Sequence, residues 1–294
     1  MKMKYNIFKI LALAVCISPF TAFAQEEAAK EPEKTTDKPV KQTFQSGTLI
    51  NNQTVVGLKK KSLEFMIQHR FGVIKDESNM YGLFDPANIR FGLGYGLTER
   101  FAIGVGVTKN KHVYDINGKY VILRQTKSGK MPVTVTAYGE MCRSGLSDEN
   151  FFNQEGKYNG NDRYSYFSEL MVGRKFNEHF SFQAAFTYSY LNIVPVGMLN
   201  ANMGASVGGR YKFSNQSSVI IDFDYPITSQ TDATLQPKPN IGLGLEVSTS
   251  GHQFQIFVTT ADGILNNVSR TYNQNDFLNR QLMIGFNINR LWSF

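Results

Sequence analysis

The sequence predicts an all-β fold: a transmembrane antiparallel up-and-down β-barrel of about 12 strands, with short periplasmic turns and longer extracellular loops. Large apolar residues recur at every second position along most of the chain, which is the period of a β-strand with one apolar face. The N-terminus has the pattern of a secretory signal, and no later apolar run reaches the roughly 18 residues that a membrane helix needs. We therefore expect an exported chain that meets lipid with its strands.

Residues 1–24 read as a signal peptide with cleavage after Ala24. Lysines supply its basic region, residues 10–17 its apolar core, and the Ala-Phe-Ala sequence at 22–24 its cleavage site. The location that follows is the outer membrane of a Gram-negative cell. Cys142 is then the only cysteine of the mature chain, so no internal disulfide is expected.

The mature chain divides into three parts. Residues 25–42 are charged and poor in apolar side chains, which predicts a disordered periplasmic tether. Residues 43–61 form a distinct N-terminal segment, a candidate periplasmic plug, because residues 43–58 carry no charge and mix Leu, Ile and Val with Asn, Gln and Thr. This segment fits either a short extra strand or a stretch tucked into the barrel. Three lysines at its end mark a membrane boundary, and residues 62–294 form the barrel.

The clearest hairpin spans residues 88–107. Large apolar side chains alternate with Arg, Gly and Ala on both sides of a polar turn at 98–100, which predicts two antiparallel strands. A similar run at 112–125 has ambiguous parity. The same alternation predicts further strands near residues 63–71, 133–140, 164–175, 180–190, 201–213, 219–225, 241–247, 254–258 and 282–294.

The links between these strands alternate in length. Short turns lie at residues 98–100, 176–179, 214–216 and 250–251. Most of the other links are long, at residues 74–86, 143–161, 228–239 and 261–279. Short periplasmic turns, long outer loops and an even number of strands are typical of bacterial outer-membrane barrels.

Six short motifs stand out: HRFG at 69–72, YGLTERFAIGVG at 95–106, KYVILRQ at 119–125, GGRYK at 208–212, GHQFQ at 251–255 and GFNINR at 285–290. On these motifs the chain from about residue 43 to its end resembles a Bacteroidota family of membrane-bound outer-membrane β-barrels, a domain of unknown function. Ser250 departs from the family pattern, in which a glycine precedes this histidine-containing motif, and this should alter only a turn. The resemblance implies the fold and the location and supplies no catalytic residue.

Charged residues and glycines with inward parity are the candidate lumen-lining residues: Glu64, Arg70, Arg90, Gly92, Gly94, Gly104, Arg210, Lys212, Asp222, Asp224 and Glu246. Both signs of charge occur, and Arg210 with Lys212 precedes Asp222 with Asp224 across one hairpin. We favour mutual neutralisation that holds the wall together, because a buried charge without a partner is costly. The alternative is a polar path for a small solute.

Two neighbouring strands present glycines to the inside, at positions 92, 94, 96, 104 and 106. A wall without side chains lets another group approach the backbone closely. That group is either a bulky side chain from across the lumen, such as Arg70 or Tyr138, or an inserted segment, for which residues 43–58 are the natural candidate. Our hypothesis is that this segment folds into or against the periplasmic mouth and narrows the pore.

No pattern predicts catalysis, a cofactor or a metal site. The glycines at 92–96 alternate within a strand, whereas a dinucleotide fingerprint opens a helix. The four histidines lack the spacing of metal ligands. His69 has lipid-facing parity near the rim, yet nothing selects a serine partner for an outer-membrane lipase. The formal net charge of +7 is too small and too scattered to predict binding of nucleic acid.

The sequence therefore predicts an integral outer-membrane barrel in contact with lipid, and not an enzyme. The interpretation that we favour is a narrow or partly plugged pore for small polar solutes. One alternative is a closed structural or anchoring barrel that binds periplasmic partners. A minor alternative is an outer-membrane enzyme that acts on lipid.

Overall fold

The computed structural model describes residues 37–75, 77–152 and 156–294. The predicted signal peptide, its cleavage site and the tether up to residue 36 lie outside the described residues. The described part contains a barrel wall, a short hairpin, and loops that include one α-helix and several 3-10 turns.

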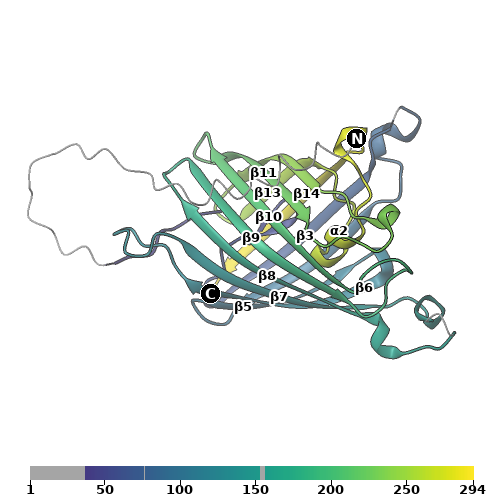
Figure 1. Cartoon of the computed structure of the whole chain (residues 1–294). Helices are drawn as coiled ribbons and strands as arrows, with labels where there is room; N and C mark the ends of the chain where they lie inside the picture. Colours follow the sequence, from purple (N-terminus) through teal and green to yellow (C-terminus); the bar gives the residue numbers. More distant parts are fainter. Residues whose placement is uncertain (1–36, 76, 153–155) are drawn as a thin grey trace, which may run out of the picture. The chain divides into compact units, whose positions relative to one another are not determined.

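Antiparallel strands close into a single twelve-stranded barrel (Figure 1). Each strand pairs with its sequence neighbours, and the last pairs with the first, with Ile288 opposite Ile67. Closure leaves no strand edge with unpaired backbone groups, as a membrane-spanning sheet requires. The predicted fold class is confirmed. The strands are β3 (Ser62–Val73), β4 (Asn88–Gly96), β5 (Phe101–Thr108), β6 (Val113–Leu123), β7 (Thr134–Ser144), β8 (Tyr164–Lys175), β9 (Phe180–Leu191), β10 (Ala201–Lys212), β11 (Ser217–Pro226), β12 (Asn240–Ser248), β13 (His252–Thr259) and β14 (Met283–Ser293).

The two faces of the wall differ in chemistry. Along β5, Ile103 and Val105 are 43% and 51% exposed on the outside, whereas Ala102 and Thr108 are buried on the inside. β13 repeats the pattern, with Ile256 60% exposed. An outward apolar band around a polar interior is the arrangement of a barrel whose outer face meets lipid.

The structure also settles the one strand whose parity the sequence leaves ambiguous. In β6, Lys119 is buried and Tyr120 is exposed, and Lys119 lies opposite Ala102 of β5. β7 continues to Ser144, beyond the predicted end at residue 140. Because side chains alternate along a strand, the parity of Lys119 also turns Asp115 inward.

The two ends of the barrel carry different links. One end has the links 97–100, 124–133, 176–179, 213–216 and 249–251, and the chain's last strand also ends there. The opposite end has the links 74–87, 109–112, 145–163, 192–200, 227–239 and 260–282. The end with the shorter links is the periplasmic end of an outer-membrane barrel, and the other is the extracellular end. The link 124–133 is longer than expected.

That longer link has a partner. The backbone N–H of Val40 donates to the carbonyl of Gln125 at 2.8 Å, and that of Lys127 donates to the carbonyl of Lys38 at 2.9 Å. Residues 37–42, which the sequence assigns to a disordered tether, therefore have backbone hydrogen bonds to the barrel.

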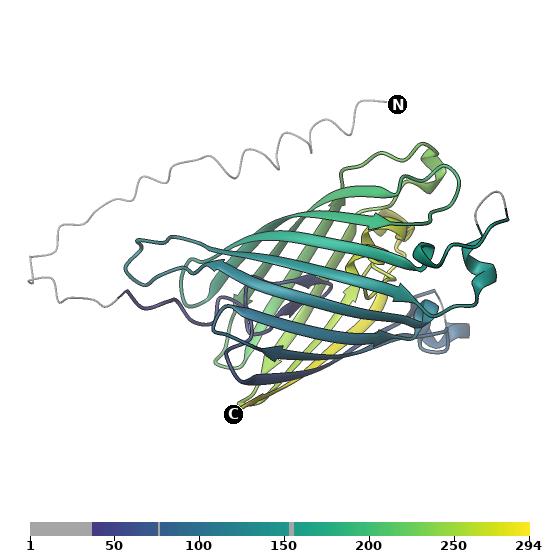
Figure 2. The ribbon, with the colours of Figure 1, turned by 90° about the horizontal axis from the view of Figure 1, so that it is seen from below.

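Two further elements belong to the interior. A hairpin of β1 (Thr48–Leu49) and β2 (Asn52–Gln53) lies within the ring of strands (Figure 2). From the extracellular end, the link 260–282 brings in α2 (Asn266–Tyr272), most of whose residues are buried. No helix in the described part of the chain is long and apolar enough to span a membrane.

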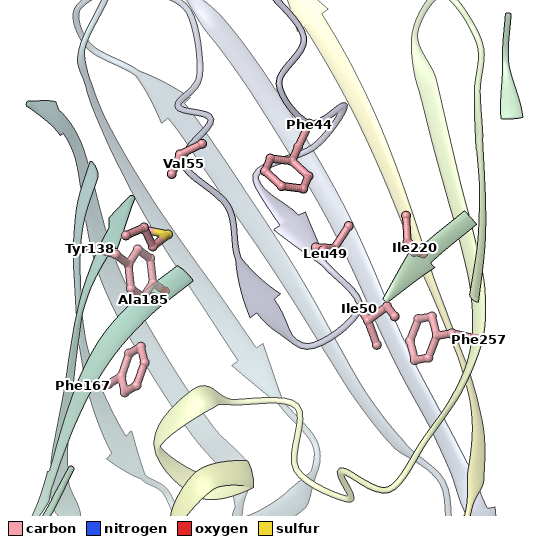
Figure 3. Packing of buried hydrophobic residues seen from close by; sticks show 10 residues of the cluster. Phe44, Leu49, Ile50, Val55, Tyr138, Phe167, Ala185, Ile220 and Phe257 are labelled. Atoms are coloured by element: carbon pink, nitrogen blue, oxygen red, sulfur yellow. The ribbon is translucent and has the colours of Figure 1, made fainter. Parts of the chain in front are cut away.

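The hairpin and the wall share a small apolar core inside the barrel (Figure 3). Figure 3 shows Leu49 and Ile50 of the hairpin turned toward Ile220 and Phe257 of the wall. The lumen is thus packed at this level instead of open. The whole cluster is Phe44, Leu49, Ile50, Val55, Tyr138, Phe167, Met171, Ala185, Ile220 and Phe257.

Candidate functional site

The turn of the β1–β2 hairpin is held by polar side chains of the barrel wall. The backbone N–H of Asn51 donates to Oδ2 of Asp222 at 3.0 Å. The Asn51 side-chain amide donates to the hydroxyl of Thr259 at 2.9 Å. All three residues are buried, so these bonds are shielded from water and fix the turn against β11 and β13.

Arg70 holds the same turn from β3. One terminal nitrogen of its guanidinium donates to the carbonyl of Ile50 at 3.1 Å and to Oδ1 of Asn51 at 2.9 Å. The other donates to Oδ1 of Asn287 at 3.1 Å, and the group lies 4.5 Å from the ring centroid of Phe257. Arg70 is 1% exposed, so the N–H donors of its planar guanidinium form their hydrogen bonds with protein groups and not with solvent.

The opposite edge of the hairpin segment contacts β7 and β9. The backbone N–H of Val55 donates to the side chain of Gln183 at 3.1 Å, and Gln183 donates back to the carbonyl of Gln53 at 2.6 Å. The hydroxyl of Thr136 donates to the carbonyl of Val55 at 2.7 Å. The segment is therefore bonded to opposite sides of the barrel.

Glycines in the wall make room for the apolar side chains of the segment. A Cβ atom at any of three glycine positions would lie less than 3.0 Å from a side chain of the segment, closer than such atoms pack. A side chain at these positions would force the neighbouring side chains to move. The pairs are Gly173 with Val55 (2.8 Å), Gly208 with Leu49 (2.9 Å) and Gly242 with Ile50 (2.9 Å).

The glycines of β4 and β5 admit two kinds of group. A Cβ at Gly94 would lie 3.1 Å from Leu58, and one at Gly96 would clash with the backbone carbonyl of Lys59. The N-terminal segment thus uses these two positions. At Gly92 the space is taken by the guanidinium of Arg90 from the same strand.

Arg90 also fills the space at Gly106, together with its partner Asp115. Arg90 and Asp115 form a two-point ion pair with N–O distances of 2.9 Å and 2.6 Å. Arg90 donates in addition to the side chain of Gln68 at 3.1 Å. The side chains that fill this space are therefore Arg90 and Asp115, with Asn117 at Gly104, in place of the expected Arg70 or Tyr138.

Arg210 pairs with Glu246 and not with Asp222 or Asp224, the acidic residues of its own hairpin that the sequence suggested. Its Nε donates to Oε1 of Glu246 at 2.8 Å, two strands away, and both side chains are almost fully buried. The backbone register explains the difference, because Arg210 lies opposite Ile220 and not opposite Asp222 or Asp224.

Arg270 of α2 joins the extracellular loop to the periplasmic hairpin. Its guanidinium donates to Oδ1 of Asn52 at 2.5 Å. It also forms ion pairs with Asp224 at 3.3 Å and Glu169 at 3.5 Å, and it lies 5.1 Å from the ring centroid of Phe167. A single cation thus contacts the wall, the loop and the hairpin at one point of the lumen.

Besides a cavity of about 10 Å³ beside Arg270, three larger cavities border the inserted elements within the described part of the chain. The outer cavity, at the extracellular end, has a volume of about 410 Å³, the middle cavity about 80 Å³, and the inner cavity, at the periplasmic end, about 630 Å³. Leu265 lines both the outer and the middle cavity. Leu58 and Glu64 line both the middle and the inner cavity. Each cavity therefore borders the next, from the extracellular ends of β6 to β9, through the β3–β7 side of the lumen, to the periplasmic end.

The structure places the candidate lumen-lining residues as follows. Arg70, Arg90, Gly92, Gly104, Arg210, Asp222, Asp224 and Glu246 are buried, and Glu64, Gly94 and Lys212 are half-buried. Arg90, Gly92, Gly94, Gly104 and Glu64 border the middle cavity. Arg70 and Asp222 contact the hairpin, and Lys212 lies at the periplasmic end of β10.

Sequence reasoning missed four charged residues of the lumen. Glu140 shares the parity of Tyr138, which the sequence already places in the lumen, and Glu169 alternates with the exposed Leu170 and Val172, so a stricter use of alternation finds both. Asp115 lies in the strand whose parity the sequence leaves ambiguous. Arg270 lies in a loop where no periodic pattern applies, so no sequence signal was available for it.

The described residues hold no group of three or more His, Cys, Asp or Glu side chains arranged to bind a metal ion. His69 lies on the outer face, where its ring stacks on Phe286 at a centroid distance of 4.9 Å and touches Phe71 at 4.4 Å. Its surroundings are aromatic, and among the described residues its ring forms no hydrogen bond to a serine hydroxyl.

The chain belongs to the family described as "Membrane bound beta barrel domain (DUF5777)", whose model matches residues 44–292. The matched region includes the hairpin segment as well as the barrel. The protein is thus a membrane-bound β-barrel of the outer-membrane type.

Several solved structures of outer-membrane barrels are similar in fold. The KdgM porin has 10% identity and a TM-score of 0.46, and the match covers 79% of this chain and 99% of that one. The NanC porin has 9% identity and a TM-score of 0.47, with coverage of 79% and 99%. An outer membrane channel from Pseudomonas putida F1 has 10% identity and a TM-score of 0.49, with coverage of 81% and 97%. No curated protein matches the chain.

Proposed function

We propose that this barrel is a narrow pore for small polar solutes, partly plugged by residues 43–58. The observation that carries the proposal is the series of three cavities, which runs from one end of the lumen to the other beside the hairpin. Exported and cleaved after Ala24, the mature chain would keep this segment next to the first strand of the barrel, where it can enter the periplasmic mouth.

The middle cavity sets the limit on passage. Its volume of about 80 Å³ holds a few water molecules, and a sugar does not fit without movement of the segment. Its lining includes the charged side chains of Glu64, Arg90, Lys119 and Glu140, which suit a hydrated or polar solute better than an apolar one. Conduction therefore requires that the hairpin segment shift or leave.

The hydrogen bonds of the segment are numerous but local. Lys119 donates to the carbonyl of Gly47 at 2.8 Å, and the side chain of Asn289 donates to the hydroxyl of Ser46 at 2.5 Å. Water can replace each of these bonds when the segment moves, so the net cost per bond is about 1 kcal/mol. We therefore infer that the segment can act as a movable plug. The proposal gives the lumen no catalytic role.

A second function, a closed barrel that anchors or binds periplasmic components, is favoured by the apolar contacts of the hairpin with Ile220 and Phe257. Burial of Leu49 and Ile50 stabilises the closed arrangement by about 1.5–3 kcal/mol for each side chain. In that case the segment would stay in place as part of the structure.

Swelling of liposomes separates the two functions. Mature protein reconstituted in lipid vesicles should admit arabinose and exclude raffinose, while protein-free vesicles admit neither. Arabinose should pass when the segment shifts, and raffinose should be excluded because the shifted segment still occupies part of the lumen. Equal exclusion of both sugars, together with unchanged exclusion after deletion of residues 25–58, would support the anchoring function instead.

A further inference from the structure

The outer cavity has features that a path for polar solutes does not need. It lies between the extracellular ends of β6 to β9, residues 146–151 and 162–163 of the link between β7 and β8, the link 192–200, and α2. Its volume of about 410 Å³ falls within the range of roughly 300–1,000 Å³ that small-molecule sites occupy. Asn150 and Pro195, which are exposed, stand at its rim.

The lining of this cavity is largely apolar. Val113, Cys142 and Leu265 form a buried cluster, and Val268 packs against it. The free energy falls when an apolar group covers apolar surface that faces water, so the wall of the cavity favours an apolar occupant. The remaining apolar and aromatic lining residues are Leu146, Phe151, Tyr164, Leu191, Ile193, Val194, Pro195 and Tyr272.

The charged lining residues are Lys111, Arg163 and Asp162. Arg163 is already engaged: it donates to the carbonyl of Ser144 at 3.2 Å and to the hydroxyl of Tyr158 at 2.7 Å. These contacts, with an ion pair to Asp148, tie the link 145–163 to the barrel end.

Among the described residues, Lys111 is the lining cation whose ammonium forms no hydrogen bond; burial lowers its pKa, and the nearby carboxylate of Asp262 opposes that shift. Its ammonium lies 4.6 Å from the ring centroid of Tyr272, and within the described part of the chain no hydrogen bond or ion pair of this group is formed. Burial raises the pKa of Tyr272 to about 12, so its ring stays neutral beside the ammonium. An aromatic face satisfies one side of an ammonium and leaves its other N–H donors for an anion.

We propose that the outer cavity binds a small amphipathic carboxylate, with its apolar body against Leu265, Val268 and Ile193 and its carboxylate on Lys111. The site concerns capture of a ligand at the extracellular mouth, so it goes beyond the proposed passage of polar solutes. Val268, which lines this cavity, and Arg270, which contacts the hairpin, both belong to α2. An occupant of the cavity would therefore touch the helix that contacts the hairpin.

Equilibrium binding to the mature protein in lipid nanodiscs tests the proposal by calorimetry, with empty nanodiscs as the background. The probes are 4-phenylbutyrate, octanoate and the neutral alcohol 4-phenylbutan-1-ol. Lys111→Gln should weaken binding of both carboxylates about tenfold and leave the alcohol unchanged, because a charge-assisted contact is lost. Lys109→Gln is the matched control, since Lys109 donates to the carbonyl of Ala87 and does not line the cavity.

Ile193→Asn provides the second test and should weaken all three probes, because it makes the apolar wall polar. Stronger binding of 4-phenylbutyrate than of octanoate would assign an aromatic body, and the reverse an alkyl body; either supports the site. Absence of carboxylate binding to the unchanged protein, or equal effects of Lys111→Gln and Lys109→Gln, would overturn it. These results do not depend on transport, so they stand apart from the sugar-permeability test of the pore.

Discussion

Gly96 shows how single residues admit the N-terminal segment. A side chain at this position would meet the backbone carbonyl of Lys59, which cannot rotate away as a flexible side chain can. Gly96→Val should therefore push the segment from the wall, and trypsin should cleave at Lys59–Lys61 faster than in the unchanged protein. The measurement is limited proteolysis of folded, reconstituted protein.

Gly139→Val is the matched control for that change. Gly139 is exposed on the outer face of β7, and a Cβ atom there meets no atom within 4 Å. Cleavage should be as slow as in the unchanged protein. Equal cleavage rates for the two valine variants would contradict the close approach of Lys59 to β4.

Arg270 should contribute strongly to stability through its ion pairs in the lumen. Arg270→Gln removes the cation that faces Asp224 and Glu169 and leaves both buried carboxylates without it. Loss of one partner of a buried ion pair costs about 3–5 kcal/mol, so the free energy of unfolding in lipid vesicles should fall by that order. Arg270→Lys, which keeps the charge, should lose less. Losses below about 1 kcal/mol for Arg270→Gln would show that the cluster does not stabilise the barrel.

Individual contacts in the lumen were only partly predictable from the sequence. Alternation predicts that Arg90 and Arg210 face inward, because parity is a local property of a strand. Their partners Asp115 and Glu246 depend on strand order and register, which alternation does not supply. Arg270 was out of reach, since its position results from how a 23-residue link folds back into the barrel, residues 260–282.

Each strand separates a lipid-facing surface from a lumen-facing surface, and β6 has two neighbouring residues, one on each surface. Ile116 is 51% exposed on the lipid face, and Asn117 lines the middle cavity. Ile116→Arg should destabilise the barrel by about 2–4 kcal/mol near the midplane of the bilayer. Asn117→Arg should cost much less, because the new cation would lie near Asp115 in a polar cavity.

Unfolding by denaturant in lipid vesicles measures both variants of β6. Similar losses of unfolding free energy for the two arginines would mean that this strand does not separate a lipid face from a lumen face. The comparison avoids β9, where Gln183 faces inward but bonds to the hairpin, so a substitution there would report on the plug as well.

Whole elements differ in how far local sequence determines them. The strands were predictable to within a few residues, as in β9 (Phe180–Leu191) against the expected 180–190, because alternation extends over many residues. The two-residue strands β1 and β2 and the seven-residue α2 are too short for a periodic signal. Contacts with the wall hold these elements in place. For β1 and β2, the uncharged composition of residues 43–58 was the sequence feature that indicated an interior position.

At the scale of the molecule, twelve strands give a lumen of intermediate width. Barrels of about eight strands are filled by their own side chains, and those of about 16–18 leave an open channel. Here the wall contributes glycines at positions such as Gly208 and Gly242, and inserted segments fill the space from both ends. Width alone therefore does not decide whether the barrel conducts.

Single-channel conductance in planar bilayers measures whether the hairpin segment blocks the lumen. The mature protein should show small or infrequent openings, since the middle cavity beside the hairpin has a volume of only about 80 Å³. Deletion of residues 25–58 should give channels with several-fold larger conductance, because the hairpin and its bonds to Arg70, Gln183 and Asp222 are removed. Identical conductance with and without these residues, in barrels that both insert and resist heat denaturation, would contradict the claim that this segment plugs the pore.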